Sequence, residues 1–273
     1  MIEASSVPAE ASAYIAGRLA ELAADQGVRI LFAIESGSRA WGFPSADSDY
    51  DVRFVYARPR GDYLSVREFR DVIETPLADD ATLGVPFDLN GWDVQKALCL
   101  ALTSNPILHE WLASPVVYTL DIAAVAALRA FVESAADRAV YRYHYDRLCR
   151  SAWTQLKADA EKATVKRYCY ALRPALMLTW LKTRDDLPPT DVKGLCDGMR
   201  LSGDVIPAMA GVFAHKRTGG EKDAVAGVAV LDALIEDALR DEAPRPDRID
   251  IATHPLLAEA DDLFLTLLGE GNS

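Results

Sequence analysis

The sequence lacks several features that would place the protein in a membrane or outside the cell. No apolar run reaches the roughly 18 residues that a membrane-spanning helix needs. Residues 1–27 have no basic segment ahead of an apolar stretch, so we expect an amphipathic helix there and no signal peptide. The four cysteines form no CxxC pair, and the four histidines are scattered. We therefore expect reduced thiols, no zinc site and a cytoplasmic location.

Positive charge is scarce overall but concentrated in one segment. The chain has 29 Lys and Arg against 41 Asp and Glu, a formal charge of −12, and such an acidic chain is unsuited to coating nucleic acid non-specifically. Residues 138–184 reverse the sign, with eleven basic and three acidic residues and a net charge of +8. This segment could be a solvated helical face or a surface that faces phosphate, and composition alone does not choose between them.

The hydrophobic pattern predicts an α+β protein with a mixed sheet in its front half and helices in its back half. The segments expected to form strands are Val28–Glu35, Asp49–Ala57, Val85–Asn90 and, more weakly, Asp71–Thr75. Short or ordinary helices are expected at Ser38–Trp41, at Val94–Leu102 and after Asn105. From Ile122 onward the apolar positions recur at helical spacing, with breaks at 185–189 and 242–246. We predict a domain at residues 1–118 and a helical domain at 119–273.

The segment IESGSRAWGFPSADSDYDVRFVYA, residues 34–57, places Asp49 and Asp51 two apart as a strand begins. Side chains two apart in a strand share a face, so these carboxylates repel and do nothing for folding by themselves. A hard divalent cation such as Mg²⁺ would convert the repulsion into ligation. A solvent-facing strand edge or an Asx turn is the alternative. The preceding Gly37-Ser38 favours a ligand, because glycine permits close approach and free N–H groups at a helix start bind anions.

The order of these residues resembles the signature of the DNA polymerase β nucleotidyltransferase superfamily. Gly37-Ser38 is followed by ten residues and then by Asp49-x-Asp51. The longer string GSRAWGFPSADSDYDVR is similar to one branch, the RNA-ligase-associated, RlaP-like predicted nucleotidyltransferases. The stretches WDVQKALCLALTSNPILHEWLASP and KRYCYALRPAL resemble two further blocks of that branch. The resemblance covers roughly residues 28–182 and implies a polymerase-β-like domain followed by an α-helical domain that contributes to the nucleotide or acceptor cleft.

The resemblance implies transfer of a nucleotide from a nucleoside triphosphate, expected to be ATP, with release of pyrophosphate. Two Mg²⁺ or Mn²⁺ ions, about 3.5–4 Å apart in such sites, would stabilise the attacking and leaving oxygens. Gly37 and Ser38 would hold the outer phosphates, and Arg39 could add a charged contact. A surface arginine paired with Asp47 or Glu35 is the alternative for Arg39, and Ser48 is expected to support the loop.

The family needs a third carboxylate on a neighbouring strand, and two residues are candidates. Asp88 lies within the apolar run PFDLN, whereas Asp93 precedes a helical stretch, the ordinary place for an N-cap. We predict Asp49, Asp51 and Asp88 as catalytic metal ligands and Asp93 as a cap, with the reverse assignment left open.

The basic segment contains a stripe that could meet the nucleotide. Lys162, Lys166, Tyr170 and Arg173 follow spacings of four, four and three, which is one face of a helix. We predict that Lys166 and Arg173 bind the triphosphate and that Tyr170 contacts a base or ribose. The alternative is a surface stripe paired with Asp159 and Glu161.

The acceptor is not determined by these patterns. An RNA end, as in RNA repair, fits a chain whose positive charge is local. A small hydroxylated molecule of the aminoglycoside type, or a toxin protein modified by an antitoxin-like enzyme, are alternatives within the class. A catalytically silent nucleotide- or RNA-binding module is the alternative outside it, and the intact Asp49, Asp51 and Asp88 argue against that reading. The oligomeric state is open.

Overall fold

The structure is a computed structural model that describes residues 2, 5–158, 164–218, 223–224 and 227–269. The chain divides into two compact units. The first, here the sheet unit, comprises Val7–Gly37, Asp49–Ala136 and the residues from Arg248. The second, the helical unit, comprises the residues up to Ser6, Ser38–Ser48 and Asp137–Asp247. The domain boundary that we predicted between residues 118 and 119 stays a prediction.

The sheet unit contains a mixed six-stranded sheet in the order β3-β5-β2-β1-β6, with β4 pairing on β5. Its strands are β1 (Arg29–Glu35), β2 (Tyr50–Ala57), β3 (Val72–Glu74), β4 (Ala78–Asp80), β5 (Val85–Asp93) and β6 (Val117–Leu120). β2 and β5 are parallel, and the other pairs are antiparallel. The four predicted strands are present, although β2 begins at Tyr50 and leaves Asp49 just outside it. The short β4 and β6 were not predicted.

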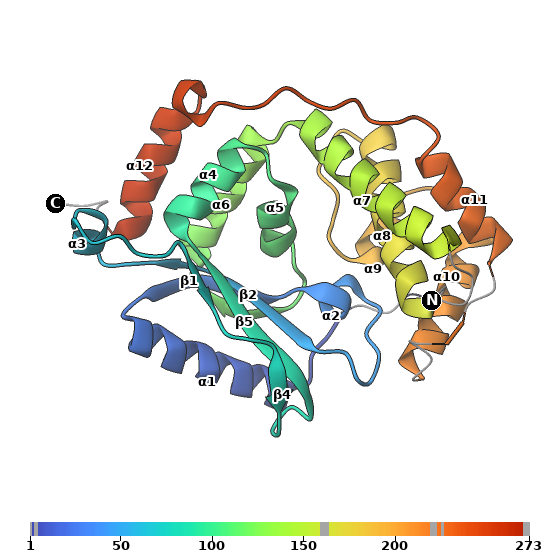
Figure 1. The fold of residues 1–273 in the computed structure, drawn as a ribbon, viewed down its shortest axis with the longest axis horizontal. Helices are drawn as coiled ribbons and strands as arrows, with labels where there is room; N and C mark the ends of the chain where they lie inside the picture. Colours follow the sequence, from blue (N-terminus) through green and yellow to red (C-terminus); the bar gives the residue numbers. More distant parts are fainter. Residues whose placement is uncertain (1, 3–4, 159–163, 219–222, 225–226, 270–273) are drawn as a thin grey trace. The chain divides into compact units, whose positions relative to one another are not determined.

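Alternating side chains bury both faces of this sheet. On one face, Val52, Phe54 and Leu89 pack with Ile15 and Leu19 of α1 (Ala9–Gln26). On the other, Val55 and Leu31 pack with a group of helices (Figure 1). These helices are α4 (Val94–Leu102), α5 (Pro106–Leu112), α6 (Ile122–Ala135) and α12 (Leu257–Leu268). A short α3 (Arg60–Tyr63) and a 3₁₀ turn (Ile251–Thr253) complete the unit. Packing thus groups two helices from the predicted helical half, α6 and α12, with the sheet.

The helical unit is built around α8 (Val165–Thr183), most of whose side chains are buried. The other helices are α7 (Arg138–Ala158), α9 (Val192–Gly198), α10 (Val205–Arg217) and α11 (Ala229–Ala238). The two predicted breaks fall between helices, as expected. Within the described part of the chain, no helix combines the length and the apolar character needed to cross a membrane.

Candidate active site

Asp51 and Asp88 lie opposite each other on the two parallel strands. The register pairs Asp51 with Asp88 and Arg53 with Asn90. Neighbouring strands are about 4.8 Å apart, and paired residues of parallel strands point to the same face. Asp51, Arg53 and Val55 therefore share the face that carries α4, α5 and α6. The two carboxylates predicted on separate strands are brought together.

The Arg53 guanidinium bridges this carboxylate pair. Its Nη1 donates to both Asp88 oxygens, at 3.0 and 3.1 Å, and its Nη2 donates to Asp51 Oδ1 at 3.0 Å. Nη1 also donates to the Val52 carbonyl at 3.0 Å. The three charged side chains are only 17–24% exposed, so water screens the ion pairs weakly.

The turn at Gly37 lies directly against the second oxygen of Asp51. A Cβ atom on Gly37 would be 2.1 Å from Asp51 Oδ2, and the glycine has a φ of +61°. Both facts require glycine at this position. Burial raises the pKa of the Asp51 carboxyl, Arg53 opposes the rise, and the nearby Asp49 and Asp88 carboxylates add to it. Asp49 is half-buried and directly precedes the strand.

A fully buried glutamate, Glu35, binds the backbone of Asp51. Glu35, at the end of β1, is 0% exposed and accepts a hydrogen bond from the Asp51 backbone N–H at 3.0 Å. Its other oxygen accepts from the Tyr118 hydroxyl at 2.5 Å. The Ser36 N–H in turn donates to the Asp51 carbonyl at 2.9 Å. These bonds fix the backbone on which the Asp51 carboxylate stands.

The described residues contain no group of three or more His, Cys, Asp or Glu that could hold a metal ion as placed. The donor chemistry nevertheless suits one, since carboxylate oxygens are the ligands that Mg²⁺ and Mn²⁺ prefer. The cation that Asp51 and Asp88 share in this structure is the Arg53 guanidinium.

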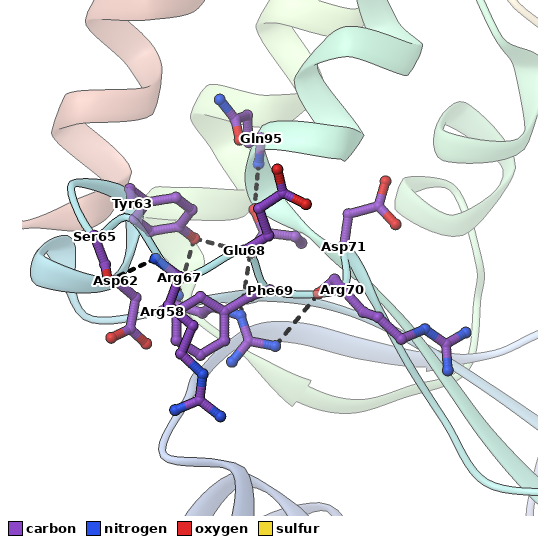
Figure 2. A pocket seen from close by; sticks show the side chains of 11 residues that line it. Arg58, Asp62, Tyr63, Ser65, Arg67, Glu68, Phe69, Arg70, Asp71 and Gln95 are labelled. Atoms are coloured by element: carbon purple, nitrogen blue, oxygen red, sulfur yellow. Dashed lines mark hydrogen bonds and ion pairs between the residues drawn. The ribbon is translucent and has the colours of Figure 1, made fainter.

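Asp93 has a different role at the other end of β5. It caps α4, accepting from the Gln95 N–H at 2.8 Å, as predicted. It also accepts from the Tyr63 hydroxyl at 3.0 Å, and burial raises its pKa. Asp93 lines a pocket of about 310 Å³ with Arg58, Tyr63 and Phe69 (Figure 2). Asp93 pairs with Tyr56 in the strand register. Because Asp93 is five residues from Asp88 on the same strand, the two side chains point to opposite faces of the sheet. These positions favour Asp88 as the third carboxylate.

The residues after Gly37 belong to the helical unit, and two of the predicted phosphate contacts lie among them. The helix α2 (Gly37–Trp41) starts at the last residue of the sheet unit. The Ser38 hydroxyl is buried and donates to Ser48 Oγ at 3.1 Å, while the Ser45 N–H donates to the same oxygen at 2.9 Å. Arg39 donates to the Ser48 carbonyl. Ser48 thus supports the loop, as expected.

Two residues of the predicted stripe contact this loop from α8. Tyr170 packs edge-on against Trp41, with ring centroids 5.5 Å apart. Arg173 is 3% exposed, lies 4.3 Å from the Trp41 ring centroid, and donates to the Thr190 carbonyl and hydroxyl, both at 3.0 Å. The predicted role of Arg173 in phosphate binding stays a prediction, and the structure gives it a packing role.

Lys166 lines a groove between α7 and α8 to which Arg173 does not contribute. The groove has a volume of about 360 Å³, and it is lined by Leu148, Ser151, Ala152, Gln155, Lys166, Arg167 and Tyr170. Lys162, the first residue of the stripe, lies outside the described residues. An aromatic ring and basic side chains over an apolar floor suit a stacked base with a phosphate beside it.

Most of the chain matches a known protein family. Residues 11–266 match RlaP, the RNA repair pathway DNA polymerase beta family. The chain belongs to this family. It is 36% identical over 237 residues to the uncharacterized protein YcgL of Bacillus subtilis (strain 168), covering 87% of this chain and 86% of that protein. A crystal structure of a nucleotidyltransferase-like protein from Exiguobacterium sibiricum 255-15 aligns with 95% of this chain and 79% of that one, at 11% identity and a TM-score of 0.30. The family makes the chain a polymerase-β-like nucleotidyltransferase.

Sequence reasoning missed two charged residues of this candidate site, Arg53 and Glu35. Arg53 follows Asp51 by two positions, so strand alternation alone places it on the same face. That signal was present but was not used. Glu35 gave no such signal, because its burial and its bond to the Asp51 N–H depend on the pairing of β1 with β2.

Gly27 and Gly37 have the same left-handed backbone conformation but different surroundings, so substituting each one separates the cost of backbone strain from the cost of a steric clash. Gly27, the C-cap of α1, has a φ of +63° and nothing within 4 Å of an added Cβ. Gly27→Ala should cost about 1–2 kcal/mol of unfolding free energy from the left-handed backbone alone. Gly37→Ala should cost a further ~1–3 kcal/mol, because its Cβ must displace the Asp51 carboxylate. Urea denaturation of both variants measures the difference, and equal losses would contradict the close approach.

Proposed function

We propose that this protein transfers a nucleoside monophosphate from a nucleoside triphosphate, ATP being the expected donor, to a hydroxyl group at an RNA end. The observation that carries the proposal is the pairing of Asp51 with Asp88 beside a glycine that meets the carboxylate directly. Two carboxylates on one sheet face, next to the start of the helix α2, can serve a triphosphate and its metal together. The description of the family supports RNA repair as the setting.

Asp49, Asp51 and Asp88 would hold the metal, with Mg²⁺ or Mn²⁺ as the ion. Bound there, the metal would stabilise negative charge on the attacking and leaving oxygens. The protein itself would position the reactants. Gly37 and Ser38 would offer backbone N–H groups to the outer phosphates, and Glu35 would keep the Asp51 backbone fixed through the 3.0 Å bond to its N–H.

The helical unit would supply part of the nucleotide or acceptor contact. Lys166 and Tyr170 line the same groove, and Tyr170 is 38% exposed. An exposed ring beside a lysine can stack a base while the lysine neutralises phosphate. This assignment keeps the predicted Lys166 and Tyr170 as binding residues.

Nucleotide transfer should depend on a divalent cation and on Asp51. The test is incubation of the purified protein with each radiolabelled nucleoside triphosphate, Mn²⁺ or Mg²⁺, and single-stranded RNA oligonucleotides. We expect labelled RNA in the wild type, no product in EDTA, and a loss of roughly 100-fold or more in Asp51→Asn, because a charged ligand becomes neutral. Product formation in EDTA would refute the metal-dependent reaction, and labelling of an aminoglycoside but not RNA would move the acceptor.

Asp88 and Asp93 should respond differently to the same substitution. Asp88→Asn should lower kcat by about 100-fold or more, since it removes charge from the site. Asp93→Asn is the matched control on the same strand, and its effect should be mild because Asn caps helices nearly as well as Asp. A larger loss of kcat in Asp93→Asn than in Asp88→Asn would assign the role of third metal ligand to Asp93.

Lys166 and Arg173 can be separated by binding and stability measurements. Lys166→Ala should weaken ATP binding by about ten- to a hundredfold, the value of one hydrogen bond to a charged group, and AMP binding much less. Its Tm should hardly change. Arg173→Ala should instead lower the unfolding free energy by about 2–4 kcal/mol, because it leaves a cavity and unpaired Thr190 groups. Calorimetric titration and denaturation check both, and equal losses for ATP and AMP in Lys166→Ala would exclude a triphosphate contact.

A further inference from the structure

The carboxylate pair of the sheet unit already holds a cation. Arg53 makes three hydrogen bonds to Asp51 and Asp88, at 3.0–3.1 Å, and uses both oxygens of Asp88. These bonds place its guanidinium between the two carboxylates rather than beside one of them. This is the place where a cation shared by both residues would lie.

The other carboxylate oxygen of Asp51 faces the turn at Gly37. Oδ2 lies against Gly37, where even a Cβ atom would come within 2.1 Å. The space between the two carboxylates is occupied by the Arg53 guanidinium. A divalent cation placed between Asp51 and Asp88 would meet both the volume and the positive charge of Arg53.

The Arg53 bridge also neutralises the repulsion between Asp51 and Asp88 when no metal is bound. Asp51 and Asp88 are 24% and 17% exposed in their side chains, and two such carboxylates on adjacent strands repel each other. A single arginine can satisfy both, because its planar fork donates several parallel hydrogen bonds. The Arg53 side chain is itself 20% exposed, so it keeps some contact with solvent.

We propose that Arg53 is the resident counter-ion of the Asp51–Asp88 pair and competes with the divalent cation for it. The inference rests on the proposed function, because it assumes that metal binds these carboxylates. Arg53 is a positioning residue: it keeps the two carboxylates convergent before metal arrives and leaves them when metal binds.

Direct binding of Mn²⁺ tests the competition without any turnover. Free Mn²⁺ is measured by electron paramagnetic resonance during titration of wild type, Arg53→Gln and the control Arg29→Gln, whose exposed arginine pairs with Asp121 on the same sheet unit. Removal of the competing charge should tighten Mn²⁺ binding by at least about tenfold in Arg53→Gln, given the strength of short-range charge repulsion in a half-buried site. Arg29→Gln should bind as the wild type does.

Thermal stability gives a second, independent readout. In EDTA, Arg53→Gln should have a lower Tm than the wild type, because its carboxylates are unpaired. Saturating Mn²⁺ should then raise the Tm of Arg53→Gln more than that of the wild type. Should Arg53→Gln fail to fold, Arg53→Lys replaces it. A lysine keeps the charge but loses the fork, so Mn²⁺ should bind Arg53→Lys tighter than the wild type.

The outcomes distinguish this inference from the proposed function. Tighter Mn²⁺ binding in Arg53→Gln that is lost on adding Asp51→Asn supports the competition. Mn²⁺ binding to the wild type with equal or weaker binding to the Arg53 variants overturns it and leaves the metal-dependent function in place. Failure of both the wild type and Arg53→Gln to bind Mn²⁺ at millimolar concentration overturns both.

Discussion

The close approach of Gly37 to Asp51 is the constraint on which the site depends. Because a Cβ atom would lie 2.1 Å from the carboxylate oxygen, the turn and the acid cannot be placed independently. Glu35 at the end of β1 pairs with Val52 in β2, so the chain comes back beside the end of β1 when β2 begins. The intervening residues, Ser38–Ser48, pack with the helical unit. One short motif therefore fixes a carboxylate in the sheet unit and a loop in the other unit.

That division explains how much of the site could be predicted from the sequence. Local alternation was enough to find β1, β2 and β5, and the helix-start position of Asp93 was enough to identify its cap. The pairing of Asp51 with Asp88 was not derivable from the pattern, because the register of two parallel strands depends on tertiary packing. The three-residue β4, with the sequence ADD, has almost no strand propensity, and it forms because β5 offers it a partner.

Several arginines of the basic segment have structural partners within the helical unit. Arg138 donates to the carbonyls of Leu181, Arg184, Asp185 and Asp186 at the end of α8, where a cation also stabilises the helix dipole. Arg150 is paired with Asp146, and Arg173 is buried. Helical spacing put Arg173 on the face of Lys166, but α8 is the central helix of its unit and buries most of its circumference. Periodicity identifies one face of such a helix without telling which neighbour it meets.

Strand alternation places Asp51 and its counter-ion Arg53 on the same face of the sheet. Asp51 and Arg53 are two apart in β2, so this strand presents an acid and a base toward the same side, and Asp49 directly precedes the strand. Burial disfavours the charged form of Asp51, and the neighbouring acids disfavour it further. The proposed metal site cannot relieve this repulsion by losing a carboxylate without losing a ligand. A removable protein cation satisfies both requirements, and arginine suits it better than lysine because one guanidinium reaches both acids at once.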